Sequence, residues 1–75
     1  MKAREFRTLR EQGQWTLKSL GTLMGIHWTT IWRYEHAQRG IPVPVALLLR
    51  RLVKDLERQR DRDARRAEGA RHADL

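Results

Sequence analysis

Apolar side chains recur three and four positions apart in successive stretches of the chain, and the first two stretches end at a glycine. This spacing is typical of amphipathic α-helices. The first stretch, Lys2–Gln12, places Phe6 and Leu9 on its inward side and stops at Gly13. Three more such stretches follow. The pattern predicts an all-α fold, a compact domain of four or five helices whose C-terminal helix is either extended or frayed.

The second helix is expected between Thr16 and Gly25. Thr16 is a favoured N-cap residue, but Ser19 stands at the third helical position, where a capping box carries Glu or Gln, so we expect the full box to be absent. Gly25 adopts the left-handed conformation without steric cost and therefore ends the helix. The positions between them at helical spacing are Leu17, Leu20, Gly21 and Met24.

A third helix is expected to begin near His27. Ile31 and Tyr34 fall on one side of it, which we expect to face the core. The other side is left to meet another molecule, and it carries Trp28, Thr29, Trp32, Arg33 and His36.

Residues 36–44 are expected to form a connecting loop, because Gly40, Pro42 and Pro44 interrupt a helix and Pro44 favours extended backbone at Val43. Pro44 itself suits the first position of the next helix. The expected inward stripe of that helix is Val45, Leu48, Leu49, Leu52 and Leu56.

The fourth helix has more apolar side chains than one face can bury. We expect a two-fold homodimer contact to cover the surplus, through Leu47, Val53 and Leu56. Residues 58–75 contain no Phe, Tyr, Trp or β-branched residue and cannot build a core. The chain therefore divides into residues 1–57 and a charged extension, 58–75. The extension either continues the helix and frays near Gly69 or is disordered, and it serves either as a weak electrostatic arm or as a solvated tail.

The net charge is +7, from 16 basic and 9 acidic side chains, which favours a polyanionic partner. Between Glu11 and Asp55 the only carboxylate is Glu35. A surface free of acids over that span suits a phosphate backbone at close range. The competing interpretation is chance in an arginine-rich composition.

Several function classes lack support in the sequence. There is no cysteine, and His27, His36 and His72 lack metal-ligand spacing, so we expect no metal, no cofactor and no enzyme activity. No apolar run is long enough to span a membrane, and Met1–Arg10 is too charged for a secretion signal. We expect a cytoplasmic protein without a membrane partner, and no small-molecule effector is evident.

A family resemblance covers most of the chain, from about Phe6 to about Leu56. It rests on the run Thr16-x-x-x-Leu20-Gly21-x-x-Met24-Gly25-Ile26-x-x-x-x-Ile31-x-x-Tyr34-Glu35. This run resembles the helix-turn-helix of the Cro/phage-repressor class, also called the Xre family, and would place the motif at residues 16–35. Leu17 departs from the pattern, since many relatives have a phosphate-contacting glutamine there.

The resemblance implies a transcriptional regulator, most simply a repressor, that binds a palindromic double-stranded DNA site as a dimer with the helix near His27 in the major groove. It also implies an ion pair between Arg10 and Glu35, which would explain a lone acid on a basic surface. The alternative is two solvated side chains, whose interaction would contribute less than ~1 kcal/mol.

The residues expected to contact DNA fall into two sets. The base-reading set is His27, Trp28, Thr29, Trp32 and Arg33, within which Arg33 is the strongest candidate because its guanidinium can donate two hydrogen bonds to guanine. The phosphate-contacting set is Thr16, Lys18, Thr30, His36 and Arg39. For Arg39 a solvated side chain is the competing interpretation.

Trp28 and Trp32 leave several interpretations open. They would press on thymine methyl groups, donate indole N–H groups to bases, or cover a second protein; alternatively one of the two, Trp32 or Trp28, folds over residues 36–43 as part of the core. The rival function is therefore a protein-binding module, an antitoxin or inhibitor that uses this indole pair. RNA binding is permitted by the charge, but no GXXG loop or stacking-sheet signature is present.

Overall fold

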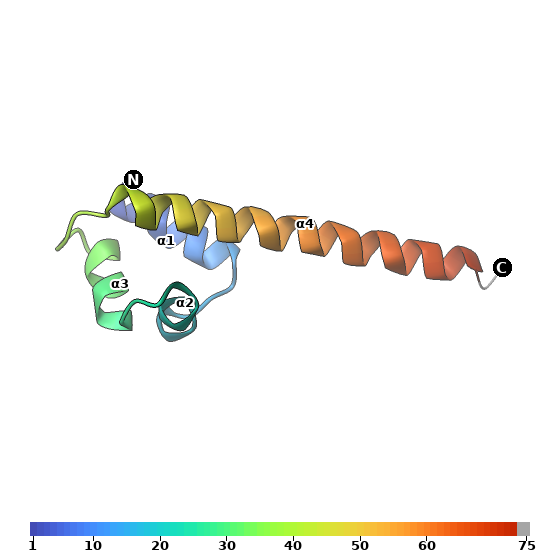
Figure 1. Cartoon of the computed structure of the whole chain (residues 1–75), viewed down its shortest axis with the longest axis horizontal. Coiled ribbons are helices and arrows are strands. Elements are labelled where there is room, and N and C mark those ends of the chain that lie inside the picture. The colour runs from blue at the N-terminus through green and yellow to red at the C-terminus, as the bar shows by residue number, and fades with distance from the viewer. Residues whose placement is uncertain (74–75) are drawn as a thin grey trace.

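Four helices and their connections account for the described backbone of the computed structural model, which covers residues 1–73, with side chains described through residue 65. Over this range the chain contains no strand, so the predicted all-α fold is confirmed. No helix in the described part of the chain is long and apolar enough to cross a membrane. The helices are α1 (Ala3–Gln12), α2 (Leu17–Met24), α3 (Trp28–Glu35) and α4 (Val43–Ala73) (Figure 1).

The core lies where α1 packs against α3 and α4, with α2 against α3 (Figure 1). The rings of Phe6 and Tyr34 meet at its centre, 5.7 Å apart and tilted by 53°. Each fully buried large side chain contributes about 1.5–3 kcal/mol relative to an exposed one. Every helix supplies at least one member of this cluster, which consists of Phe6, Leu20, Ile31, Tyr34, Leu49 and Val53.

The end of α1 falls where the sequence predicted, at Gly13. Gly13 is not the left-handed residue, however, since its φ is −76° and the following Gln14 has φ 60°. Glycine is required at position 13 for space, because a Cβ there would overlap the Trp15 ring. Trp15 packs over this turn and against the core.

The structure at the α2 N-terminus contradicts the expectation that the full capping box is absent. Ser19 N–H donates to Thr16 Oγ1 at 3.0 Å, and Thr16 N–H donates to Ser19 Oγ at 2.8 Å, so the capping box is complete. The serine hydroxyl takes the acceptor role that a glutamate carboxylate usually fills. At the other end Gly25 has φ 70° and ψ 30°, which confirms the predicted left-handed termination.

The turn after α2 folds back tightly onto the helix at Gly21. Ile26 N–H donates to Gly21 O at 2.9 Å. A Cβ at position 21 would lie 2.5 Å from Ile26 O and 3.3 Å from Trp28 N. The missing side chain therefore lets the backbone that enters α3 lie directly against α2.

The start of α4 is one residue earlier than predicted. Val43 is the first helical residue and Pro44 the second, and Ala46 N–H donates to Pro42 O at 3.1 Å. Amides of the first helical turn have no partner inside a helix, so the N–H that Pro44 lacks costs nothing there. The predicted extended conformation of Val43 is wrong.

The buried face of α4 is rotated from the predicted stripe. Ala46, Leu49 and Val53 are buried, whereas Leu48 is exposed. The reason is that α1 packs along the side of α4 defined by Leu49 and Val53. Val53 belongs to the core, so its assignment to a dimer interface is wrong. Leu47 is exposed and Leu56 half-buried.

Beyond the core α4 continues as a single helix that projects past the other three (Figure 1). It runs without a break across residues 57 and 58 and past Gly69, which matches the first of the two predicted alternatives, a continued helix. The molecule is elongated as a result, with extents of 56 × 20 × 17 Å. In the part of the molecule where the four helices pack together, Arg50 Nη2 lies 3.1 Å from Glu5 Oε1 and links α4 to α1 at the surface.

Candidate nucleic-acid interface

An ion pair between Arg10 and Glu35 fixes the C-terminal end of α3. Arg10 Nε and Nη2 donate to the two oxygens of Glu35 at 2.8 and 3.0 Å, and Nη1 donates to Trp15 O at 2.9 Å. These hydrogen bonds to Glu35 are the main cause that raises the pKa of Arg10. The predicted pair is therefore present as a two-pronged clamp that ties α3 to α1 and to the turn before α2.

The clamp also buries Glu35, which is the only acidic residue between Glu11 and Asp55 in the sequence. The Glu35 side chain is 3% exposed. Residues 12–54 therefore present no free carboxylate to solvent, while Lys18, Arg33 and Arg39 are exposed. A polyanion approaching this part of the molecule meets cations without opposing charge.

The side of α3 opposite its buried residues is exposed at four of the five predicted positions, whereas Thr29 is half-buried. Ile31 and Tyr34 are in the core, whereas Trp28 is 38% and Trp32 37% exposed and Arg33 is exposed. Trp32 does not fold into the core. Its ring instead stacks on His36, with 3.9 Å between ring centroids and 18° between ring planes.

The two indoles border a shallow depression that includes a residue the sequence analysis missed. Gln38 lines it together with Trp28, Thr29, Trp32 and Arg33. Gln38 follows the end of α3, where its N–H donates to Arg33 O at 2.9 Å. Because it lies in the loop, helical spacing gives no signal for its position. An amide side chain here adds both a donor and an acceptor to the surface.

His27 begins α3 and its ring orientation follows from its hydrogen bonds. Its Nδ1 accepts from Thr29 N–H at 3.3 Å and lies 2.7 Å from Thr29 Oγ1. A backbone N–H can only donate, so Nδ1 carries no proton and the hydroxyl of Thr29 is the second donor. The proton of the neutral ring is then on Nε2. His27 thus offers an N–H donor, and Thr29 offers an acceptor oxygen.

His36 has the opposite arrangement. Its Nδ1 lies 2.8 Å from Trp32 O, and a carbonyl oxygen can only accept, so Nδ1 carries the proton. In the neutral ring Nε2 is then an acceptor, which a phosphate oxygen does not satisfy. His36 can donate to phosphate through Nε2 only as the imidazolium, and in either form it holds Trp32 in place.

The four remaining residues expected to contact phosphate do not share one site. Lys18 lines a depression with Thr22, His27 and Trp28, which joins α2 to the start of α3. Thr16 Oγ1 accepts from Ser19 N–H and keeps its own hydrogen for an anion, and Thr30 is half-buried on α3. Arg39 lines a separate depression beside Tyr34.

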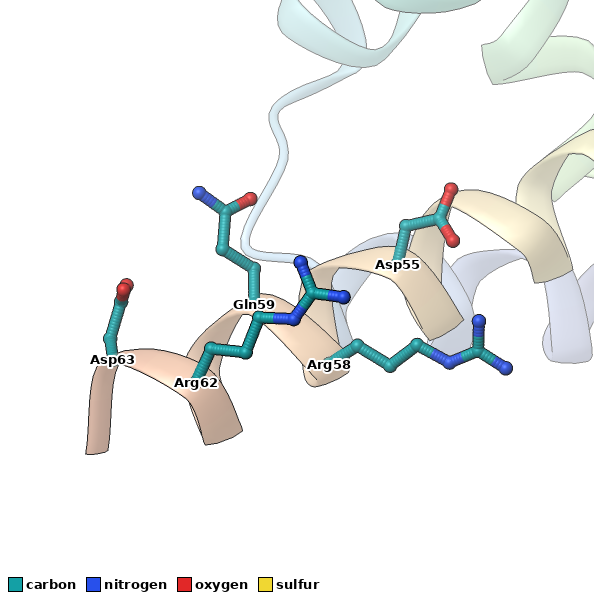
Figure 2. Close-up of a pocket in the computed structure, with 5 residues that line it drawn as sticks. All are labelled: Asp55, Arg58, Gln59, Arg62 and Asp63. Carbon is teal, nitrogen blue, oxygen red and sulfur yellow. The ribbon is translucent and has the colours of Figure 1, made fainter. Parts of the chain in front are cut away.

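A further surface depression lies on the projecting part of α4. Figure 2 shows its side chains rising from successive turns of that helix alone, with acidic and basic groups interspersed: Asp55, Arg58, Gln59, Arg62 and Asp63. No second element encloses it, so it has none of the desolvation that a catalytic pocket provides. Among the residues whose side chains are described, no group of three His, Cys, Asp or Glu could hold a metal ion.

No protein-family model, curated protein or solved structure matches this chain. The resemblance to the Cro/phage-repressor class therefore rests on the residues and spacings of the run from Thr16 to Glu35.

Proposed function

We propose that this protein is a sequence-specific double-stranded DNA-binding transcriptional regulator, acting as a homodimeric repressor on a palindromic site. The observation that carries the proposal is the exposed side of α3. It combines Trp28, Trp32 and Arg33 on a short helix held by the Gly25 turn at one end and by the Arg10 clamp at the other. A rigid helix with such a side chain set suits insertion into a major groove.

In this proposal, different side chains of the site recognise different chemical groups of the bases. Arg33 donates two hydrogen bonds to the N7 and O6 acceptors of a guanine, and the Nε2–H of His27 donates to a single base or phosphate acceptor. The indoles of Trp28 and Trp32 cover thymine methyl groups. Gln38, at the edge of the same depression, is suited to an adenine or to the backbone beside it.

Phosphate contacts orient the helix. The N-terminus of α2 presents free backbone amides and the Thr16 hydroxyl to one strand, and Lys18 adds a charge beside His27 and Trp28. The absence of a free carboxylate from residues 12–54 lets this surface approach phosphates without repulsion.

The proposed dimer contact lies on α4 and keeps two of its three predicted residues. Leu47 is exposed and Leu56 half-buried, so both remain accessible after Val53 is assigned to the core. A two-fold contact would present two α3 helices to half-sites about 34 Å apart, one turn of DNA. Two bound subunits would block a promoter sterically, which is the basis for proposing repression.

The test is selection of bound sequences from a random double-stranded DNA pool, followed by salt titration on the selected site. We expect an inverted repeat, an affinity that falls steeply with salt, and a change in tryptophan fluorescence on binding. Recovery of no sequence, together with unchanged fluorescence at low salt, would contradict the proposal.

The exposed indole pair also favours a second candidate, a module that binds and inhibits another protein. Two tryptophans bordering one depression are typical of protein interfaces. In that case Trp28→Ala and Trp32→Ala would abolish partner binding, and the protein would show no salt-dependent affinity for DNA.

A further inference from the structure

The depression beside the two tryptophans of α3 is lined by side chains of two chemical kinds. Its lining residues are Trp28, Thr29, Trp32, Arg33 and Gln38. The two indoles are apolar over most of their surface, whereas Arg33 and Gln38 carry hydrogen-bonding groups. An apolar wall with a few polar groups beside it is typical of a site that recognises a small chemical group.

Each indole is held by a histidine ring next to it. His36 stacks on Trp32, with 3.9 Å between ring centroids and 18° between ring planes. His27 lies against Trp28, with 5.8 Å between centroids and 31° between planes. Both tryptophans nevertheless stay accessible, since Trp28 is 38% and Trp32 37% exposed. The indoles are therefore supported by the protein before a ligand arrives, which reduces the ordering that binding must cost.

Arg33 follows Trp32 directly in the chain and lines the same depression. Consecutive residues of a helix rise by about 1.5 Å, and neighbouring bases of one DNA strand are about 3.4 Å apart. In the proposed complex Arg33 binds a guanine, so an indole of this depression meets a base pair next to that guanine.

The apolar group that a base pair offers in the major groove is the methyl group at C5 of a pyrimidine. Thymine carries this methyl group, and 5-methylcytosine carries it at the same place, whereas cytosine has only a hydrogen there. At C4 thymine has an acceptor oxygen and cytosine a donor amino group. The amide of Gln38 has both a donor and an acceptor and is compatible with either. The depression is therefore suited to detect the methyl group rather than the type of pyrimidine.

We propose that this depression binds the C5 methyl group of a pyrimidine adjacent to the guanine that Arg33 contacts, in thymine and in 5-methylcytosine alike. The inference rests on the proposed function and adds a means of regulation to it. Where the pyrimidine is cytosine, methylation of the DNA creates the contact with the indoles and strengthens binding. Unmethylated cytosine leaves the same indoles without an apolar partner.

The test places four pyrimidines in turn next to that guanine, in both half-sites of the selected DNA. They are thymine, deoxyuridine, 5-methylcytosine and cytosine, each opposite its complementary base. The members of the first pair differ only in the methyl group, and so do those of the second. We expect the wild type to bind the methylated member of each pair about fourfold more tightly, the effect of burying one methyl-sized group. The guanine is identified beforehand as the position where Arg33→Ala loses its base preference.

A double variant connects this ratio to the depression. Trp28→Ala combined with Trp32→Ala removes the apolar wall and should bring the ratio of affinities in both pairs to about one. The matched control is Leu23→Ala, which removes a side chain 52% exposed on α2 and should keep the fourfold ratio. Each ratio compares two DNAs on the same protein, so a general loss of affinity cancels.

Failure of this inference is distinguishable from failure of the proposed function. If the wild type binds no DNA, the function fails and the inference fails with it. If the wild type binds the selected site but all four pyrimidines equally well, the methyl site is overturned while the function stands. A difference between thymine and deoxyuridine without one between 5-methylcytosine and cytosine overturns the response to methylation. A ratio that persists in the double tryptophan variant assigns the methyl contact to other residues and overturns the inference.

Discussion

At the residue scale the two histidines of the candidate interface have opposite tasks because the same ring nitrogen, Nδ1, accepts a hydrogen bond in His27 and donates one in His36. His27 accepts a backbone N–H through Nδ1 and directs a donor outward. His36 donates through Nδ1 to the carbonyl of Trp32 and stacks on that indole. His27 is thus a direct DNA contact in the proposed complex, whereas His36 chiefly positions Trp32.

Arg33→Ala and Lys18→Ala separate base recognition from phosphate binding. We expect Arg33→Ala to relax the preference at one base pair by about 1–3 kcal/mol, because a bidentate guanine contact is lost. Lys18→Ala should weaken all sequences alike and lower the salt slope by about one. Affinities for a set of single-base variants at several salt concentrations provide the measurement. Equal weakening of every variant by Arg33→Ala would exclude base recognition by that side chain.

Arg10→Ala should strongly destabilise the fold. It leaves the Glu35 carboxylate buried without its partner, and breaking a buried pair in this way costs about 3–5 kcal/mol. The matched control is Arg7→Ala, which removes the exposed pair with Glu11 and should cost less than about 0.5 kcal/mol. Urea unfolding monitored by circular dichroism measures both. Arg10→Met combined with Glu35→Leu should recover much of the loss, since no unpaired charge remains.

At the scale of elements, α2, α3 and the turn between them were predictable because their signals are local. Thr16 and Gly25 determine where α2 begins and ends, and the spacing of Ile31 and Tyr34 determines which side of α3 is buried. The face of α4 was not predictable in the same way. Apolar residues nearly surround its first turns, so the packing of α1, which is a tertiary property, decides that Val53 is buried and Leu48 exposed.

The candidate site shows the same division between local and tertiary information. The side of α3 that carries Arg33 follows from helical period alone. Gln38 could not be inferred, since its position depends on the loop conformation. The Ser19 contribution to the capping box was missed because the usual motif has a longer side chain.

Gly21→Ala tests whether the close return of the turn onto α2 positions α3. A Cβ at this position would be 2.5 Å from Ile26 O, so the turn must move, and we expect a loss of about 1–3 kcal/mol despite the better helix propensity of alanine. Gly40→Ala is the control, because nothing lies near its Cβ position and its φ is not positive. It should be neutral or stabilise by up to about 1 kcal/mol. Thermal unfolding of both variants provides the comparison, and equal stability would show that the turn adapts freely.

At the scale of the whole molecule, the core uses only the first part of the long helix α4. Among the side chains described through residue 65, the last buried one is Val53, while α4 continues to Ala73 and projects beyond the other helices (Figure 1). A chain that stops after Glu57 should therefore keep its melting temperature within a few degrees, since the described side chains that it removes, those of residues 58–65, are all exposed. Calorimetry of the truncated and full-length proteins checks this. A large loss of stability would mean that the extension packs against another part of the assembly.

The proposed dimer is tested by charge placed on the exposed part of α4. Leu47→Glu replaces an apolar side chain that the body does not cover, so the monomer fold should persist while a two-fold contact would bring two like charges together. We expect wild-type protein to occupy an inverted repeat as two subunits with cooperative binding, and Leu47→Glu to bind its half-sites independently and at least tenfold more weakly. Leu23→Glu is the matched control, because Leu23 is equally apolar and exposed but lies on α2. Sedimentation of the protein–DNA complexes distinguishes the stoichiometries. Unchanged cooperative binding by Leu47→Glu would place the dimer contact elsewhere, whereas its loss in Leu47→Glu but not in Leu23→Glu would assign it to α4.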